Sequence, residues 1–263
     1  MENKYCLNCN NPVSGKYCSN CGQKSDTHRI TFKHFVLHDI MHGVFHFEKG
    51  MLFTAKQALV RPGKAALDYI YGKRINYYNI FYFILLLIGI NLFLGYCYEI
   101  FEKRVFAEYF AEREFNEAGI RLHEILNTYT KLMILTVVPV FGIKSYLFFR
   151  RKKLNLTEHF ILSGILLLGV ALIYTIINTL TFLGFIIDSE NLKTYLIYFC
   201  FPFLAIGYAM YGYFNAFRED YALFGILIRL IFLVILILVE LYATVFLFLL
   251  FFVGKGNTII YSL

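Results

Sequence analysis

Four cysteines near the start of the chain have the spacing that most directly indicates chemistry in this sequence. Cys6 and Cys9 form one Cys-x-x-Cys pair, Cys18 and Cys21 form a second, and eight residues separate the two pairs. Two such pairs supply four thiolates, which can surround one zinc ion as a tetrahedron. Because four cysteine ligands leave no open coordination position, we expect a structural Zn²⁺. Residues 1–24 are therefore predicted to form a small zinc ribbon.

A row of histidines forms the second candidate site. These residues, which recur at every fourth position, are His34, His38, His42 and His46. They lie in a stretch, residues 30–50, that the pattern predicts to be an amphipathic helix, so the imidazoles share one stripe. Such imidazoles can bind a second metal or exchange protons, with Asp39 or Glu48 as an oxygen ligand. The alternative, which we favour, is a membrane-surface helix whose histidines form its polar edge.

An acidic residue inside an apolar stretch is the third candidate site. Glu240 follows Val-Ile-Leu-Ile-Leu-Val deep in the last apolar segment, where a charge is costly. Arg229 lies about three helical turns earlier, so the two side chains share a face without touching. Glu240 could be a proton or cation site, or a neutral carboxyl packed against Asn91, Asn178 or a tyrosine hydroxyl. We expect Lys144, near the end of another apolar segment, to extend to the headgroups, and Arg229 to do the same.

The rest of the chain has the composition of a multi-pass membrane protein. Of its 263 residues, 59% are hydrophobic and 16% are charged, which lies outside the range of ordinary soluble domains. The apolar residues gather in runs of about 20 residues or more, long enough to cross a hydrocarbon core of about 30 Å. These stretches lie near residues 77–98, 131–149, 160–187, 194–217 and 222–253. The sequence predicts an all-α integral membrane protein, with about five transmembrane helices in a bundle over residues 77–263.

Residues 25–76 connect the ribbon to this bundle and are predicted to form cytoplasmic or interfacial amphipathic helices. Residues 52–60 have an amphipathic pattern, and an Arg-Pro-Gly-Lys sequence then interrupts it. Pro62 cannot continue a helix interior, and Gly63 permits a sharp turn. A second short helix is expected to end at Gly72, just before two basic residues and the first apolar run.

The distribution of charge predicts the orientation in the membrane. The first 76 residues hold eleven Lys and Arg, and the 150–159 loop opens with Arg-Arg-Lys-Lys. The 99–130 loop carries seven acidic residues against four basic ones. By the positive-inside rule the N-terminus and the 150–159 loop are cytoplasmic, and five spans place the C-terminus outside. A reducing cytoplasm favours metal binding over a disulfide for the paired cysteines.

Several short motifs within roughly the first 80 residues occur in a recognisable order. They are Tyr17-Cys18-Ser-Asn-Cys21-Gly22-Gln23, Arg29-Ile-Thr31, the stretch around His34 and His38, Glu48-Lys-Gly50 with Thr54, Arg61-Pro62-Gly63-Lys64, and Tyr71-Gly72-Lys73-Arg74 leading to Tyr77-Tyr78. This order resembles an uncharacterised bacterial family in which a zinc ribbon precedes a multi-pass membrane domain. Many of its members have a proline where this chain has Asn79-Ile80. The resemblance implies a protein of the bacterial inner (cytoplasmic) membrane and supplies no activity.

The sequence favours a non-enzymatic role. It has no Gly-rich phosphate loop, no His-Glu-x-x-His and no nucleophile elbow. We expect a cytoplasmic ribbon that docks a protein partner beside membrane lipids. Nucleic acid is a weaker candidate because Lys4, Lys16 and Lys24 make only a thin basic patch. The alternatives are a transporter or pore for protons or a divalent metal, using Glu240 and the His34–His46 stripe, and a membrane enzyme acting on lipid. A homo-oligomer is left open.

Overall fold

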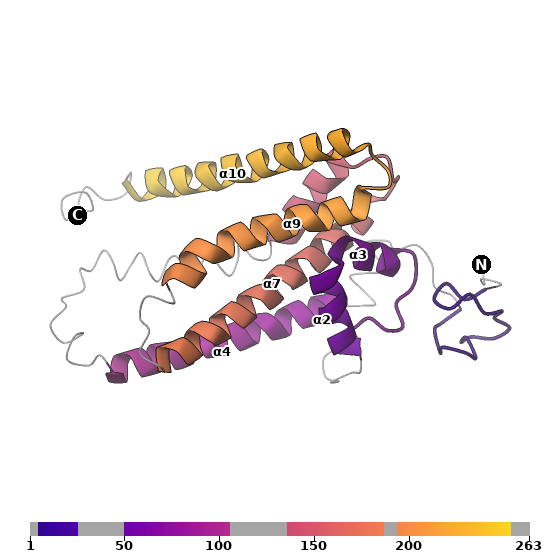
Figure 1. Ribbon diagram of the computed structural model, residues 1–263, viewed down its shortest axis with the longest axis horizontal. Helices are drawn as coiled ribbons and strands as arrows, with labels where there is room; N and C mark the ends of the chain where they lie inside the picture. The colour runs from indigo at the N-terminus through magenta and orange to yellow at the C-terminus, as the bar shows by residue number, and fades with distance from the viewer. Residues whose placement is uncertain (1–4, 26–49, 106–135, 187–193, 254–263) are drawn as a thin grey trace.

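The computed structural model describes residues 5–25, 50–105, 136–186 and 194–253 (Figure 1). In these ranges the chain is helical apart from the ribbon and short turns, and it has isolated β-bridges but no strands. The helices are α2 (Gly50–Val60), α3 (Pro62–Ile70), α4 (Ile80–Val105), a helix at Thr136–Phe148, α7 (Leu156–Ile186), the π-helix η2 (Thr194–Cys200), α9 (Phe201–Phe217) and α10 (Leu223–Val253). The all-helical architecture predicted from the sequence is confirmed.

Four of the described helices are long and apolar enough to cross a membrane. Their candidate spans are Ile80–Tyr98, Leu156–Gly184, Tyr195–Phe217 and Leu223–Glu240. The Thr136–Phe148 helix is shorter, and the predicted span that contains it begins among residues outside the described ranges. The fourth predicted stretch divides near Pro202, where η2 gives way to α9, and the last stretch is one continuous helix.

Helix α7 is the central element of the bundle. It packs against α2, α3, α4, α9 and η2, and α4 runs alongside it (Figure 1). Leu162, Ile165 and Leu168 are fully buried, as expected for a helix that is apolar on all sides and surrounded by others. The core is therefore built around α7.

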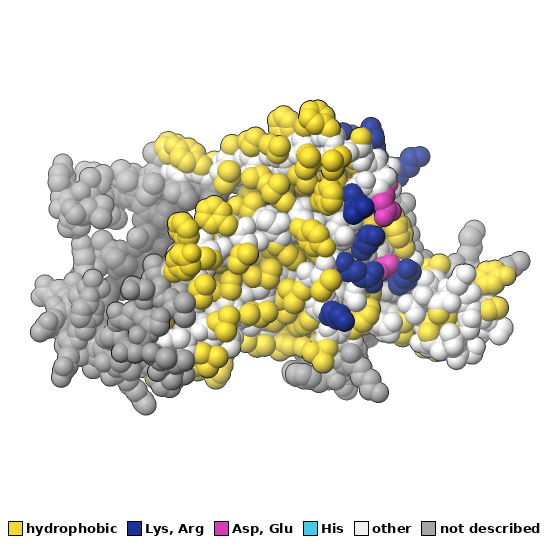
Figure 2. Space-filling model, in the orientation of Figure 1, with side chains coloured by type: hydrophobic (Ala, Val, Ile, Leu, Met, Phe, Trp, Pro, Cys, Tyr) yellow, Lys and Arg dark blue, Asp and Glu magenta, His cyan; other side chains and the backbone are white. Residues whose placement is uncertain are grey.

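One end of the bundle carries a band of basic side chains (Figure 2). The ribbon, the 149–155 connection and the 218–222 turn lie at this end, and the end of α10 lies at the other (Figure 1). Figure 2 shows a band of Lys and Arg side chains here, beside a long apolar surface. Ion pairs join its segments, among them Lys64 to Glu219 at 3.7 Å and Lys152 to Asp220 at 2.8 Å. We call this region the basic end.

Helices α2 and α3 meet at the predicted proline break, and α9 completes the hydrogen bonding there. Pro62 begins α3 and has no N–H to donate to the carbonyl of Ala58. The Tyr208 hydroxyl of α9 donates to that carbonyl instead, at 2.5 Å. The Tyr211 hydroxyl donates to the Val60 carbonyl at 2.8 Å. Backbone groups freed by the break therefore keep hydrogen-bond partners.

The break also lets α3 approach α9 at backbone distance. A Cβ on Gly63 would lie 2.3 Å from both the Ala216 nitrogen and the Gly212 carbonyl oxygen. The Lys64 N–H donates to the Asn215 side-chain oxygen at 2.8 Å. Only glycine fits at position 63. The predicted interfacial helix α3 is thus packed into the basic end of the bundle.

Candidate metal centre

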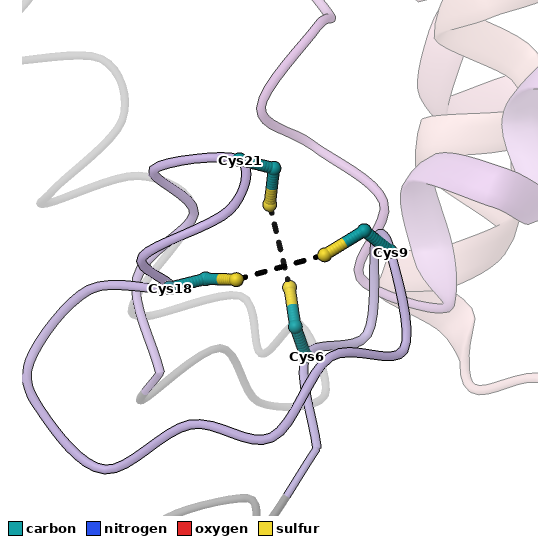
Figure 3. Close-up of side chains that lie close together, drawn as sticks. All are labelled: Cys6, Cys9, Cys18 and Cys21. Carbon is teal, nitrogen blue, oxygen red and sulfur yellow. Dashed lines mark hydrogen bonds between the residues drawn. The ribbon is translucent and has the colours of Figure 1, made fainter.

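The four cysteines of the ribbon come together as the spacing predicts (Figure 3). Their sulfur atoms all lie within 4.8 Å of one another. The Cys6 and Cys21 sulfurs are 3.5 Å apart, and the Cys9 and Cys18 sulfurs are 3.6 Å apart. Four sulfurs about 2.3 Å from a central zinc would form a tetrahedron with edges of about 3.8 Å. The donor set and its spacing therefore fit one metal ion.

The ribbon consists of two nearly identical knuckles, residues 5–12 and residues 17–24. In each knuckle, the backbone N–H of the first cysteine donates to the carbonyl of the residue five positions later. The carbonyl of the same cysteine accepts from the N–H of the residue four positions later, and all of these bonds are 2.8 Å long. The residue after the second cysteine is left-handed, with φ of 61° at Asn10 and 75° at Gly22, and asparagine and glycine tolerate this conformation best. The bridges that close the knuckles are Tyr5–Pro12 and Tyr17–Lys24. Local sequence thus sets the position of every sulfur.

Hydrogen bonds prepare one of the thiols for metal binding. The pKa of the Cys9 thiol is lowered to about 6, first by the backbone N–H of Asn11 and then by the Asn20 side chain. These groups stabilise the thiolate, which is the form that binds metal. Cys6 and Cys18 are buried, so the site is partly shielded from water.

The second knuckle is attached to the membrane domain through Gln23. This side chain is only 4% exposed, and its amide nitrogen donates to the Gly72 carbonyl at 2.6 Å. Its amide oxygen accepts from the Arg74 N–H at 3.2 Å. Asn11, the equivalent residue of the first knuckle, is exposed. One knuckle is therefore docked on the turn after α3, and its counterpart faces outward.

The second predicted site lies outside the described residues. Its members are His34, His38, His42, His46 and Asp39. The prediction of a histidine stripe therefore stays a prediction.

The Glu240 carboxylate of α10 has a partner that the sequence reasoning did not identify. Glu240 forms an ion pair with Lys144 of the Thr136–Phe148 helix, with side chains 45% and 10% exposed. The Lys144 ammonium also lies 5.3 Å from the centre of the Phe141 ring. The expectation that Lys144 extends to the headgroups is wrong, because its ammonium pairs with the Glu240 carboxylate, and such pairing is less costly than leaving a charge alone among apolar helices. Asn91 and Asn178 instead bond to each other, at 3.1 Å.

Arg229 is placed at the basic end, away from Glu240. Its Nε donates to the Phe148 carbonyl at 3.1 Å, and its Nη1 donates to the Gly225 carbonyl at 2.7 Å. Its guanidinium carbon lies 4.4 Å from the centre of the Tyr221 ring. Arg229 therefore stabilises the end of the neighbouring helix.

The sequence analysis did not predict a buried polar cluster in the bundle. The Ser145 hydroxyl lies 2.7 Å from His159 Nδ1, and the Ser163 hydroxyl lies 3.4 Å from the Tyr213 hydroxyl. All four side chains are buried, and His159 Nε2 has no partner among the described residues. Serines and a histidine scattered over separate apolar stretches give no spacing signal, so only the packing brings them together.

The described part of the chain thus comprises a helical bundle with membrane-length helices and an N-terminal cysteine cluster able to bind a metal ion. Comparison with models of known families, with curated proteins and with solved structures finds no match to this chain. The resemblance to the zinc-ribbon membrane family therefore stays a prediction.

Proposed function

We propose that this protein resides in the bacterial inner membrane and that its ribbon, holding Zn²⁺, is a docking module for a protein partner. The observation that carries this proposal is the unequal environment of the two knuckles. The second is attached to the bundle through Gln23. The first exposes Tyr5 and Leu7, and Tyr17 of the second knuckle is exposed as well.

The exposed side chains suit protein recognition. Tyrosine is one of the residue types that concentrate binding energy at protein interfaces. The metal site and the bridges hold the knuckle loops in one shape, so little conformational entropy is lost on binding. Attachment through Gln23 further gives the first knuckle a constant orientation relative to the membrane.

The charges at the basic end support a cytoplasmic location for the ribbon. Lys and Arg gather at this end of the bundle (Figure 2), and positively charged connections favour the cytoplasmic side. The ribbon, the 149–155 connection and the 218–222 turn would then face the cytoplasm. The end of α10 would lie on the outer side.

The environment of Glu240 favours docking over transport. Its carboxylate is paired with Lys144, and a carboxylate with a resident cation is a poor site for a second cation. The ribbon likewise offers four thiolates, which leave no coordination position for a reacting water.

Site-specific photo-crosslinking in intact cells tests the docking proposal. A photoreactive amino acid at Leu7 should give one defined protein adduct. The same group at Ser19, the equivalent and exposed position of the second knuckle, serves as the matched control. The Leu7 adduct should disappear when Cys6→Ser and Cys9→Ser remove the metal site. Identical adducts from both positions, or none from Leu7, would contradict the proposal.

A further inference from the structure

We propose that the basic end carries a specific site for the phosphate of an anionic phospholipid, formed by Arg151 and Arg229 around Tyr221. The two arginines belong to separate segments, the connection before α7 and the second turn of α10. Their guanidinium carbons lie 4.8 Å and 4.4 Å from the centre of the Tyr221 ring. Both guanidinium groups therefore pack against one aromatic side chain.

Hydrogen bonds to the backbone hold both guanidinium groups. Arg151 Nη1 donates to the Asp220 carbonyl at 3.2 Å. The backbone N–H of the same residue donates to the Tyr221 hydroxyl at 3.1 Å. Arg229 uses Nε and Nη1 for the carbonyls of Phe148 and Gly225. Among the described residues, Arg229 Nη2 donates no hydrogen bond to a backbone carbonyl. Preoriented arginine N–H groups are the preferred ligands of phosphate oxygens.

The two cations lack an anionic partner within the described part of the chain. The nearby acids are occupied elsewhere, since Asp220 pairs with Lys152 and Glu219 pairs with a lysine of α3. Arg229 lies about 9 Å along α10 from its first residue, close to the level of the headgroups. A positive charge at this depth is favourable where an anion meets it.

The surface beside the cations is suited to acyl chains. Phe232 and Leu236 follow Arg229 on the same face of α10 and are exposed. Leu147 is exposed on the neighbouring helix. The surface thus continues from cationic to apolar in the direction of the membrane interior. Free phosphate would satisfy only its first part, and a phospholipid satisfies both.

Native mass spectrometry of the full chain, offered equal amounts of phosphatidylglycerol and phosphatidylcholine with matched acyl chains, tests the site. We expect the wild type to retain phosphatidylglycerol preferentially. Arg151→Gln combined with Arg229→Gln should abolish the preference, because each cation removed should lower the relative affinity for phosphatidylglycerol by about fivefold. The control pair is Arg150→Gln with Arg218→Gln, which removes the same charge from the same end. These arginines lie over Tyr146 and Phe214, so the preference should persist.

Four further results decide the matter. If both variant pairs lose the preference for phosphatidylglycerol equally, the charge at this end acts diffusely and the proposed site is wrong. A wild type that shows no preference would also contradict the site. Arg151→Gln alone, which leaves the Phe148 carbonyl bonded, should still lose about fivefold, so misfolding of the double variant cannot imitate the result. If inorganic phosphate stabilises the lipid-free protein against heat as much as phosphatidylglycerol does, the ligand is free phosphate and the lipid assignment fails.

Discussion

At the basic end, α3 approaches α9 until backbone atoms are in contact, whereas beyond the middle of the bundle the helices turn large apolar side chains outward. Gly63 marks the first region, because no side chain fits between it and Gly212. Leu92 and Phe93 of α4 and Phe203 of α9 mark the second, where they are exposed for contact with lipid. Among the described glycines, the closest approach to the backbone of another helix is thus at the end that carries the ribbon. Equivalent substitutions should therefore have unequal effects in the two regions.

The largest effect should follow from removing the thiolates of the ribbon. Cys18→Ser combined with Cys21→Ser should reduce the metal content from one ion per chain to none. The ribbon should then become sensitive to protease, because metal binding of about 10–16 kcal/mol drives the folding of such small units. Metal analysis and limited proteolysis measure both changes, and the helix content of the bundle should not change.

Cys97→Ser and Cys200→Ser are the matched controls for this experiment, since these cysteines lie in α4 and η2. They should leave the metal content unaltered. A full equivalent of metal surviving the loss of Cys18 and Cys21 would move the metal site to the His34–His46 stripe. The comparison of the two regions would then no longer rest on the ribbon.

The next largest effect should come from glycines in the two regions. Gly63→Ala places a methyl group against the backbone of α9, so we expect a loss of about 3 kcal/mol of unfolding free energy. Gly89→Ala in α4 meets no atom within 4 Å, and alanine should gain up to about 1 kcal/mol there. Equilibrium unfolding in mixed micelles measures both. Similar values for the two variants would show that α3 is not packed tightly on α9.

A third effect concerns the ion pair between the Thr136–Phe148 helix and α10. Lys144→Met leaves the Glu240 carboxylate without its cation, and we expect a loss of about 2–3 kcal/mol. Adding Glu240→Leu should restore stability to within about 1 kcal/mol of the wild type, since the isolated charge is gone. A double-mutant cycle gives the coupling energy. Additive losses would mean that the two side chains do not interact.

Local patterns in the sequence predicted the ribbon, the break at Pro62 and the apolar stretches, because each depends on residues close together in the chain. They did not predict the pairing of Lys144 with Glu240, which are 96 residues apart, or the contact of Gln23 with Gly72, which are 49 apart. Such contacts depend on how helices and knuckles pack. The usual outcome for a lysine near the end of a span is to extend toward water. Here a carboxylate on a neighbouring helix draws it inward.

The smallest effect should separate the two knuckles themselves. Gln23→Ala leaves the Gly72 carbonyl and the Arg74 N–H without their partner, at a cost of about 1–2 kcal/mol to the docking of the ribbon. Asn11→Ala removes the equivalent side chain from an exposed position, and its effect should stay within about 0.5 kcal/mol. Hydrogen exchange of the backbone around Gly72 measures the difference.

Metal content should be normal in both variants, because the Gln23 backbone carbonyl still accepts from the Cys18 N–H. A loss of protection around Gly72 without loss of metal would therefore isolate the docking contact from the integrity of the ribbon. If Gln23→Ala and Asn11→Ala behave alike, the second knuckle is not attached through this side chain. The first knuckle would then have no constant orientation toward a partner, and the proposed docking function would lose its main structural support.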